Sequence, residues 1–269
     1  MTATTTTSYH PTLDLAIRAL EVALPAAAQG MEQDEEWIVA KTARGWQKIR
    51  LHDYADVYEV PGLYEKWVYE LLECRSPQRV ADLLLPAVAE DGLEAEDLSV
   101  LDLGAGNGYV ADVLSARGVE HFVGVDIFEQ AAEAAERDRP GLYSDYVVGD
   151  LTNLPCGQAA ILAQNSFNCL TCVAALGFGD IPPEVFAAAF NQIEPHGWAA
   201  FTIKKDFVGD DDRSGFACLI KRMVEHGVME KRVQKPFVHR VSTDGEELIY
   251  QAFIGRKRRD IPDAWIDGS

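Results

Sequence analysis

The run LDLGAGNGYV, residues 101–110, places an acidic residue beside three closely spaced glycines. Glycine at these positions permits positive φ angles and lets a ligand approach the main chain. Tyr109 stands where a dinucleotide-binding loop has its third glycine, and the Gly-Lys-Ser/Thr ending of a phosphate loop is missing. The carboxylate of Asp102 would also repel a phosphate. The run therefore predicts a ligand that presents an ammonium group, and no phosphate, to this loop.

Two further acids end the next two apolar runs of the sequence. Asp126 closes FVGVD and Asp150 closes YVVGD. At a strand end, Asp126 can accept two hydrogen bonds from a ribose diol, and Asp150 can accept one from an exocyclic amine such as that of adenine. Each acid alone is also explained as a loop cap. All three acids in this order describe one nucleoside with an amino-acid tail.

The segments that would position these acids alternate between apolar runs and helix-compatible sequence. The apolar runs cover residues 99–103, 121–125, 146–148, 167–176 and 198–203. This alternation predicts a parallel sheet with helices on both faces. Residues 237–241 and 248–255 flank STDGEE and predict an antiparallel hairpin. The predicted fold class is α/β, with a doubly wound, mostly parallel seven-stranded sheet, a C-terminal antiparallel hairpin and three α/β/α layers.

Helical spacing of apolar residues also marks the N-terminal part of the chain. It extends from Thr12 to about Gln29, and again from about Gly62 to Leu85. These helices are expected to cover one end of the sheet as a lid. The predicted organisation is a disordered tail at 1–11, a helical lid or extension at 12–95, a ligand-binding α/β domain at 96–258 and a tail at 259–269.

DLGAGNG, the acid of GVDIF and the acid of GDLTNLP together resemble the class I S-adenosylmethionine-dependent methyltransferases. The resemblance covers residues from about 50 to 256 and implies S-adenosylmethionine as methyl donor and S-adenosylhomocysteine as product. The cofactor-binding residues that it implies are Tyr58, Asp102, Gly104, Ala105, Gly106, Asn107, Gly108, Asp126, Ile127, Asp150 and Leu151.

The resemblance also implies a role for each of these residues. Asp102 and the glycine loop would face the methionine part, Asp126 would bind the ribose and Ile127 would pack against adenine. Asp150 and Leu151 would recognise the edge of the base. Tyr58, or else Tyr54, would reach the cofactor carboxylate, unless these tyrosines serve ordinary aromatic packing.

The acceptor should approach from beyond the strands at 167–176 and 198–203, because methyl transfer is an in-line displacement that requires close positioning. In ALGFGDIPP, Phe178 and Asp180 could wall the acceptor pocket, although Asp180 is better explained as a helix cap. Asp180, Lys204 and His239 are weak candidates for a catalytic base. A structural, hydrogen-bonded histidine accounts better for His239.

The pair Cys169 and Cys172 spells C-x-x-C inside a predicted strand. Strand residues three apart face opposite sides of the sheet, so the two thiols cannot bind one metal ion. Neither an H-x-x-x-H motif nor a clustered acidic metal site is apparent. The sequence predicts a metal-independent enzyme without a metal site.

The formal net charge of −19 makes nucleic acid and anionic lipid improbable partners, because a surface this acidic repels phosphates. The basic run RKRR at 256–259 is read as a solvated strand end. The sequence has no secretory signal, no apolar run of roughly 18 residues and only five cysteines without a regular framework. We expect a cytoplasmic protein.

The leading function is methyl transfer to an O, N or C atom of a small-molecule acceptor. The alternative is a non-catalytic module or scaffold of the same fold that binds S-adenosylmethionine or S-adenosylhomocysteine. A filled pocket on the acceptor side would favour the module. The N-terminal helix could be a lid, a dimer arm or both, which leaves a homodimer open.

Overall fold

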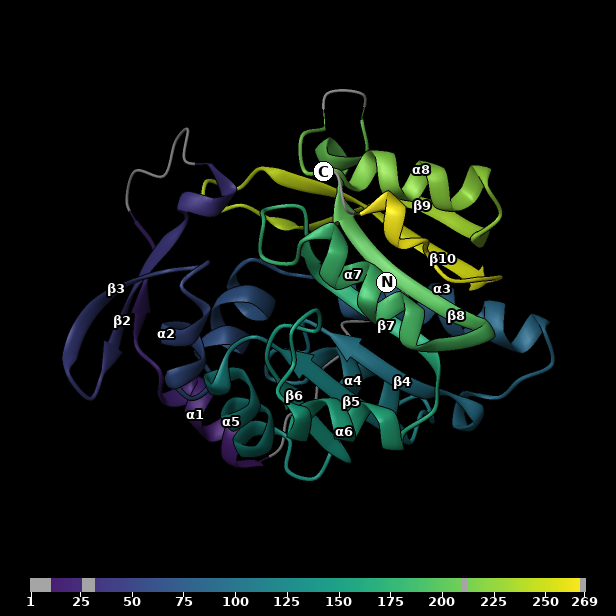
Figure 1. Ribbon diagram of the computed structural model, residues 1–269. Helices are drawn as coiled ribbons and strands as arrows, with labels where there is room; N and C mark the ends of the chain where they lie inside the picture. Colours follow the sequence, from purple (N-terminus) through teal and green to yellow (C-terminus); the bar gives the residue numbers. More distant parts are fainter. Residues whose placement is uncertain (1–10, 26–31, 210–211, 267–269) are drawn as a thin grey trace.

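A seven-stranded sheet forms the centre of the computed structural model, which describes residues 11–25, 32–209 and 212–266 (Figure 1). The strand order is β6-β5-β4-β7-β8-β10-β9. The strands are β4 Ser99–Leu103, β5 His121–Asp126, β6 Asp145–Val148, β7 Phe167–Leu176, β8 Ile193–Lys204, β9 Met229–Val241 and β10 Glu247–Lys257. Neighbours from β6 to β8 pair in parallel, whereas β10 is antiparallel to both β8 and β9. The predicted fold class is confirmed.

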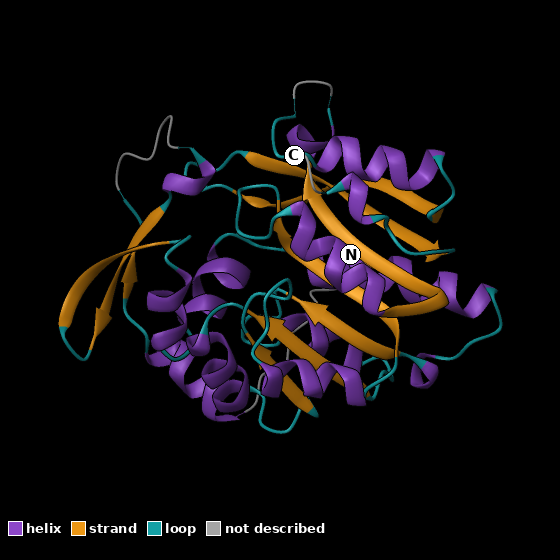
Figure 2. Ribbon diagram, viewed as in Figure 1, coloured by secondary structure: helices purple, strands orange, loops and turns teal. Residues whose placement is uncertain are grey.

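Helices cover both faces of this sheet (Figure 2). One face packs against α6, α7 and α8, and the other packs against α3 and α4. The helices are α1 Pro11–Ala19, α2 Tyr54–Glu59, α3 Ser76–Glu90, α4 Tyr109–Ser115, α5 Glu129–Asp138, α6 Cys156–Gln164, α7 Pro183–Gln192 and α8 Phe216–Glu225. Short helical turns lie at Gln33–Glu35, Ala95–Asp97, Lys205–Val208 and Asp263–Trp265, and a π-helical segment, η2, at Glu65–Leu71. The result is the predicted three-layer arrangement.

A second, three-stranded sheet in the N-terminal part was not predicted. It consists of β1 Val22–Ala23, β2 Trp37–Thr42 and β3 Gly45–Arg50. The helix predicted for 12–29 instead ends at Ala19, and residues 26–31 lie outside the described residues. Burial alternates along β2, but the segment is too short and too mixed in polarity to stand out in the sequence.

The N-terminal part is tied to the end of the β9–β10 hairpin. The carboxylate of Glu36 pairs with the guanidinium of Arg240, and both side chains are almost fully buried. Backbone hydrogen bonds join Arg75 N–H to His239 O and Val241 N–H to Leu72 O, each at 2.8 Å. Residues 32–75 therefore lie against the carboxyl end of the sheet. Whether the boundary between lid and domain falls at residue 95 stays a prediction.

Two predictions about the end of the chain need correction. Strand β9 begins at Met229, eight residues before the predicted start, because its first half is a Lys- and Arg-rich edge strand without an apolar run. Lys257, predicted as part of a solvated strand end, is buried. Its ammonium donates to the carbonyls of Phe190, Asn191 and Ile193 at the end of α7.

Cys169 and Cys172 face opposite sides of the sheet, as predicted for a strand. Each is fully buried in a different core cluster. Among the described residues, no group of three or more His, Cys, Asp or Glu side chains is arranged to hold a metal ion. No helix in that part of the chain has the length and apolarity needed to cross a membrane.

Candidate active site

The glycine loop connects β4 to α4 through three residues with positive φ. Gly104, Gly106 and Gly108 have φ angles of 68°, 55° and 86°, which side chains disfavour. At Gly106 an added Cβ would lie 2.5 Å from the hydroxyl oxygen of Tyr58. Glycine is thus required at residue 106 both by the backbone and by the tyrosine packed on it.

Asp102 lies beneath the loop with its side chain turned into the protein. Its carboxylate accepts hydrogen bonds from Thr171 Oγ1 at 2.6 Å and from Tyr143 Oη at 2.8 Å. Burial raises the pKa of Asp102 to about 6, against these two hydrogen bonds, which lower it. The side chain lines neither of the two cavities described below, so the contact with an ammonium group stays a prediction.

A cavity of about 270 Å³ opens beyond the carboxyl ends of β4, β5, β6 and β7. The residues predicted for the cofactor that line this cavity are Tyr58, Gly104, Asp126, Ile127 and Asp150, and Tyr54 lines it as well. The predicted residues that do not line it are Asp102, Ala105, Gly106, Asn107, Gly108 and Leu151. Tyr58 lies over the loop, while Leu151 packs against the core.

Asp126, at the end of β5, and Asp150, just after the neighbouring strand β6, both line this cavity. Asp126 accepts hydrogen bonds from the backbone N–H groups of Gly106 and Phe128, each at 3.0 Å. Burial raises its pKa, and these backbone donors partly oppose that shift. Asp150 accepts from Thr152 N–H at 2.9 Å and from its hydroxyl at 2.8 Å. Both acids therefore cap loops and also line the cavity, so the loop-cap interpretation leaves room for a ligand contact, which stays a prediction.

Ile127 gives this end of the cavity an apolar surface. Its side chain is 60% exposed and stands between two half-buried residues, Asp126 and Phe128. An exposed large apolar side chain in a concave site is typical of a ligand-binding surface. Ile127 between Asp126 and Asp150 fits a planar base attached to a ribose.

A buried polar network, which the sequence did not reveal, holds the loop from the other side. Glu65, in η2, accepts a hydrogen bond from Asn107 Nδ2 and pairs with Arg139 at 2.9 Å. Arg139 also donates to the Asn107 carbonyl at 2.9 Å. Burial raises the pKa of Glu65, and the charge of Arg139 opposes that shift. A charged pair separated by 74 positions has no local sequence signal.

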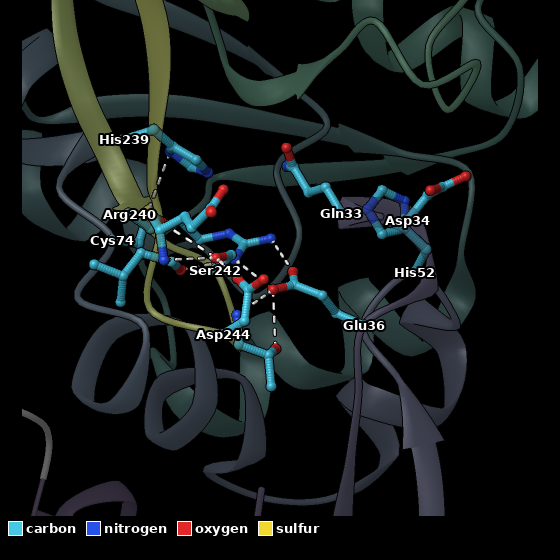
Figure 3. A network of polar contacts seen from close by, with 12 residues as sticks. Gln33, Asp34, Glu36, His52, Cys74, His239, Arg240, Ser242 and Asp244 are labelled. Atoms are coloured by element: carbon cyan, nitrogen blue, oxygen red, sulfur yellow. Dashed lines mark hydrogen bonds and ion pairs between the residues drawn. The ribbon is translucent and has the colours of Figure 1, made fainter. Parts of the chain in front are cut away.

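A small second chamber, of about 30 Å³, adjoins the main cavity toward β9 and β10. The two spaces share the wall residues Tyr54, Tyr64, Ala174, Ala175 and Asp180. The other residues around the chamber are Gln33, Leu51, His52, Val68, Cys74, Phe178, His239, Arg240 and Tyr250. Figure 3 shows Gln33, Glu36 and His52 on the N-terminal side, with His239 and Arg240 on the hairpin.

Ala174 marks a distortion of β7 where the two spaces meet. Its φ of 60° is unusual for a residue with a side chain, and the pairing of β7 with β8 shifts register between Cys172 and Leu176. The Ala174 N–H is held by Thr202 Oγ1 at 2.8 Å. Bulges and strained backbone of this kind concentrate at functional sites.

The residues predicted for the acceptor side lie in different surroundings. Asp180 does not cap α7, whose first turn lacks a side-chain cap; its carboxylate instead lies 3.4 Å from His52 Nδ1. Phe178 lines the chamber beside it. Lys204 lines neither space; it pairs with Asp206 and lies over the Phe178 ring.

His239 is a wall residue held by structural contacts. Its Nδ1 lies 2.7 Å from Ser76 Oγ, and its ring lies 4.0 Å from that of Tyr250. Burial lowers the pKa of His239 well below its ordinary value, and the charge of Arg240 adds to this effect. The geometry favours the structural interpretation. His52, which faces Asp180, was overlooked because a lone histidine before a short helix has no distinctive spacing.

Comparisons with known proteins agree with this geometry. Residues 101–201 match the family model described as a methyltransferase domain. These residues therefore form a methyltransferase domain. NodS, an N-methyltransferase from Bradyrhizobium japonicum solved with S-adenosylhomocysteine, has the same fold, with a TM-score of 0.52 and 13% identity. That alignment covers 77% of this chain and 97% of NodS.

Two other similar structures have somewhat lower TM-scores, and the description of only the first names an acceptor. A proposed RNA methyltransferase from Pyrococcus horikoshii aligns with a TM-score of 0.49 and 15% identity, over 69% of this chain and 86% of that one. A S-adenosylmethionine-dependent methyltransferase from Clostridium acetobutylicum aligns with a TM-score of 0.48 and 14% identity, over 73% and 96%. No curated protein sequence matches the chain. The methyltransferase domain is thus identified without its acceptor.

Proposed function

We propose that this methyltransferase transfers the methyl group of S-adenosylmethionine to an O, N or C atom of a small-molecule acceptor by in-line displacement. The observation that carries the proposal is the pair of joined spaces. One space has Asp126, Asp150 and the exposed Ile127, which suit adenosine. The other adjoins it at Asp180 and has both polar and aromatic walls. A filled acceptor side would have favoured a non-catalytic module, whereas a chamber is present here.

The residues at the β5 and β6 ends suit the adenosine part of the cofactor. Asp126 would accept hydrogen bonds from the ribose, Ile127 would cover the base and Asp150 would accept from its amine. The bound sulfonium would supply the transferable methyl group. The chain's own contribution is to position the acceptor in line and to exclude water from a site walled by aromatic residues.

The size of the chamber supports a small acceptor. It is about 30 Å³, which admits a group of a few atoms and not a nucleobase. The surface charge points the same way, because an excess of 19 negative charges opposes the approach of a polynucleotide. A larger acceptor would have to extend outward through the main opening.

Calorimetric titration with S-adenosylhomocysteine tests the cofactor part of this proposal. We expect binding in the micromolar range or tighter, and competition by adenosine, since the described contacts concern that part. Folded protein that binds neither S-adenosylhomocysteine nor S-adenosylmethionine would refute the function. Binding of both with no methyl acceptor in any chemical class would favour the module.

A further inference from the structure

The second chamber presents hydrogen-bond acceptors, one net negative charge and aromatic rings to whatever enters it. We propose that this chamber is the acceptor subsite for a small primary or secondary amine, and that His52, oriented by Asp180, takes the proton from that amine. The inference rests on the proposed methyl transfer and names its substrate class. The observations behind it are contacts on the side of the cavity near the β9–β10 hairpin. The assignment of the cofactor residues does not depend on these contacts.

Gln33 supplies an unpaired polar group in the chamber wall. The residue is 7% exposed, and its Nε2 donates to Tyr250 Oη at 2.9 Å. Within the described part of the chain its Oε1 has no hydrogen-bond partner. A buried oxygen left unpaired costs about 1–3 kcal/mol, so such groups usually have a ligand or water. A ligand with N–H donors would satisfy it.

The charges around the chamber favour a cation. The wall contains the guanidinium of Arg240, but both of its Nη groups bind the Glu36 carboxylate, and Nη1 also donates to the Val241 carbonyl at 2.9 Å. The Arg240–Glu36 pair thus carries no net charge, and both Nη groups of Arg240 are already engaged. The carboxylate of Asp180 therefore remains as the net charge facing the space.

Aromatic rings complete the walls. Tyr54, Tyr64, Phe178 and Tyr250 all line the chamber. The faces of such rings attract ammonium groups, most strongly where water is excluded. A carboxylate combined with several rings suits an alkylammonium better than a neutral alcohol or an anion.

His52 has the geometry of an oriented base. Its Nδ1 lies 3.4 Å from Asp180 Oδ2, and its ring centroid is 5.4 Å from that of Tyr54 and 5.3 Å from that of Phe178. Nδ1 faces the carboxylate, which leaves Nε2 to accept a proton, and the carboxylate then stabilises the imidazolium. The other titratable or charged groups around the chamber are Tyr54, Tyr64, Cys74, His239, Arg240 and Tyr250.

The proposed step balances in atoms and charge. The amine enters as an ammonium, and one N–H proton moves to His52 Nε2. The freed lone pair forms a bond to the methyl carbon while the carbon–sulfur bond breaks. The electron pair of that bond stays on sulfur, which changes from a sulfonium to a thioether. The product leaves as a methylated ammonium, and the proton on His52 passes to solvent.

Binding of methylammonium, the smallest alkylammonium probe, tests the subsite. Full-length protein saturated with S-adenosylhomocysteine is titrated with [¹³C]methylammonium, and [¹³C]methanol serves as the neutral comparison, both followed by NMR line width. We expect saturable broadening of methylammonium alone, weakened at least tenfold in Asp180→Asn. Saturable binding of methanol instead, or of neither probe, would overturn the amine assignment. If S-adenosylhomocysteine itself does not bind, the proposed function fails first.

Turnover with S-adenosylmethionine and methylammonium tests the role of His52. We expect formation of dimethylammonium, reduced by about 10²–10⁴-fold in His52→Gln, as for a lost general base, with S-adenosylhomocysteine affinity unchanged. This deficit should shrink toward pH about 10, near the ordinary pKa of an alkylamine, because the amine then arrives deprotonated. His121→Gln, at an exposed histidine, is the matched control. An equal loss at all pH values would assign His52 a structural role only.

Discussion

The carboxylate of Asp126 binds the glycine loop directly, since its Oδ2 accepts a 3.0 Å hydrogen bond from the backbone N–H of Gly106. The residue at the end of β5 thus holds the loop that follows β4. Its other oxygen accepts from Phe128 N–H, also at 3.0 Å. One side chain therefore fixes two loops that meet at the cavity, and a ribose would meet a carboxylate that is already oriented.

Replacing Asp126 by Ala should weaken binding of S-adenosylhomocysteine. The loss of a charged acceptor corresponds to about 1–3 kcal/mol, or about 5- to 150-fold in Kd. Calorimetry measures it, with Asp145→Asn as a control at a half-buried aspartate of the neighbouring strand β6. Unchanged affinity in folded Asp126→Ala protein would show that the cofactor does not contact Asp126.

Asp102 should make the stability of the protein fall as the pH rises from about 4 to about 6. Its pKa is about 6 when folded and about 3.9 when unfolded, so in that range the folded state binds more protons. The stabilising contribution is present below pH 4 and is lost as the pH rises through 6. A difference of about two units between the folded and unfolded pKa corresponds to about 3 kcal/mol in the free energy of unfolding.

The variant Asp102→Asn isolates this contribution. It keeps the shape of the side chain and cannot ionise, so its stability relative to the wild type should improve by up to about 3 kcal/mol between pH 4 and pH 7. Urea unfolding at several pH values measures the stability of both proteins. In the difference between variant and wild type, the contributions of all other titrating groups cancel. A stability difference that does not change with pH would mean that Asp102 titrates normally.

The sequence could predict the sheet because its signals are local. The runs around Asp102, Asp126 and Asp150 are short, apolar and separated by helical sequence, and each acid lies where a parallel strand ends. The side of the site formed by distant segments could not be predicted this way. Glu65 meets Arg139, and His52 meets Asp180, only after folding.

Asp102 shows a different limit of sequence reasoning. The glycine-loop motif alone predicts that this carboxylate faces a ligand, because its charge suits an ammonium. Thr171 on β7 and Tyr143 before β6 instead supply donors from beneath the loop. Which way a strand residue faces depends on neighbours that the motif does not contain.

Replacing Glu65 by Gln should destabilise the fold strongly. Glu65 is fully buried and neutralises Arg139, whose side chain is 5% exposed. Removing one member of a buried ion pair leaves the other uncompensated and costs about 3–5 kcal/mol. Chemical denaturation measures this loss. Glu70→Gln, in the same η2 segment, is the control, because its pair with Lys66 is partly exposed and should contribute less than about 1 kcal/mol.

A second substitution distinguishes charge from packing at this position. Adding Arg139→Met to Glu65→Gln removes the uncompensated guanidinium, so part of the lost stability should return. A double variant whose loss equals the sum of both single losses would show that the pair is not coupled. The loop residue Asn107 contacts both side chains, so binding of S-adenosylhomocysteine should weaken in Glu65→Gln as well.

Two glycines of the loop after β7 provide a test of how the acceptor side is shaped. Gly177 and Gly179 have φ angles of 114° and 90°, so alanine at either site should cost about 1–2 kcal/mol in backbone strain. The two sites differ in the room that they leave for an added side chain. An added Cβ at Gly177 would lie 2.1 Å from Phe207 Cδ2, whereas at Gly179 nothing lies within 4 Å.

Gly177→Ala should therefore be less stable than Gly179→Ala by about 1–3 kcal/mol, the usual cost of overpacking. Phe207 contacts Phe178 edge-on with ring centroids 5.0 Å apart, and Phe178 lines the second chamber. Displacing Phe207 should thus raise KM for the acceptor more than it raises the Kd of S-adenosylhomocysteine. Urea unfolding and steady-state kinetics measure the two effects. Equal behaviour of the two variants would show that Phe207 moves aside freely and does not shape the chamber.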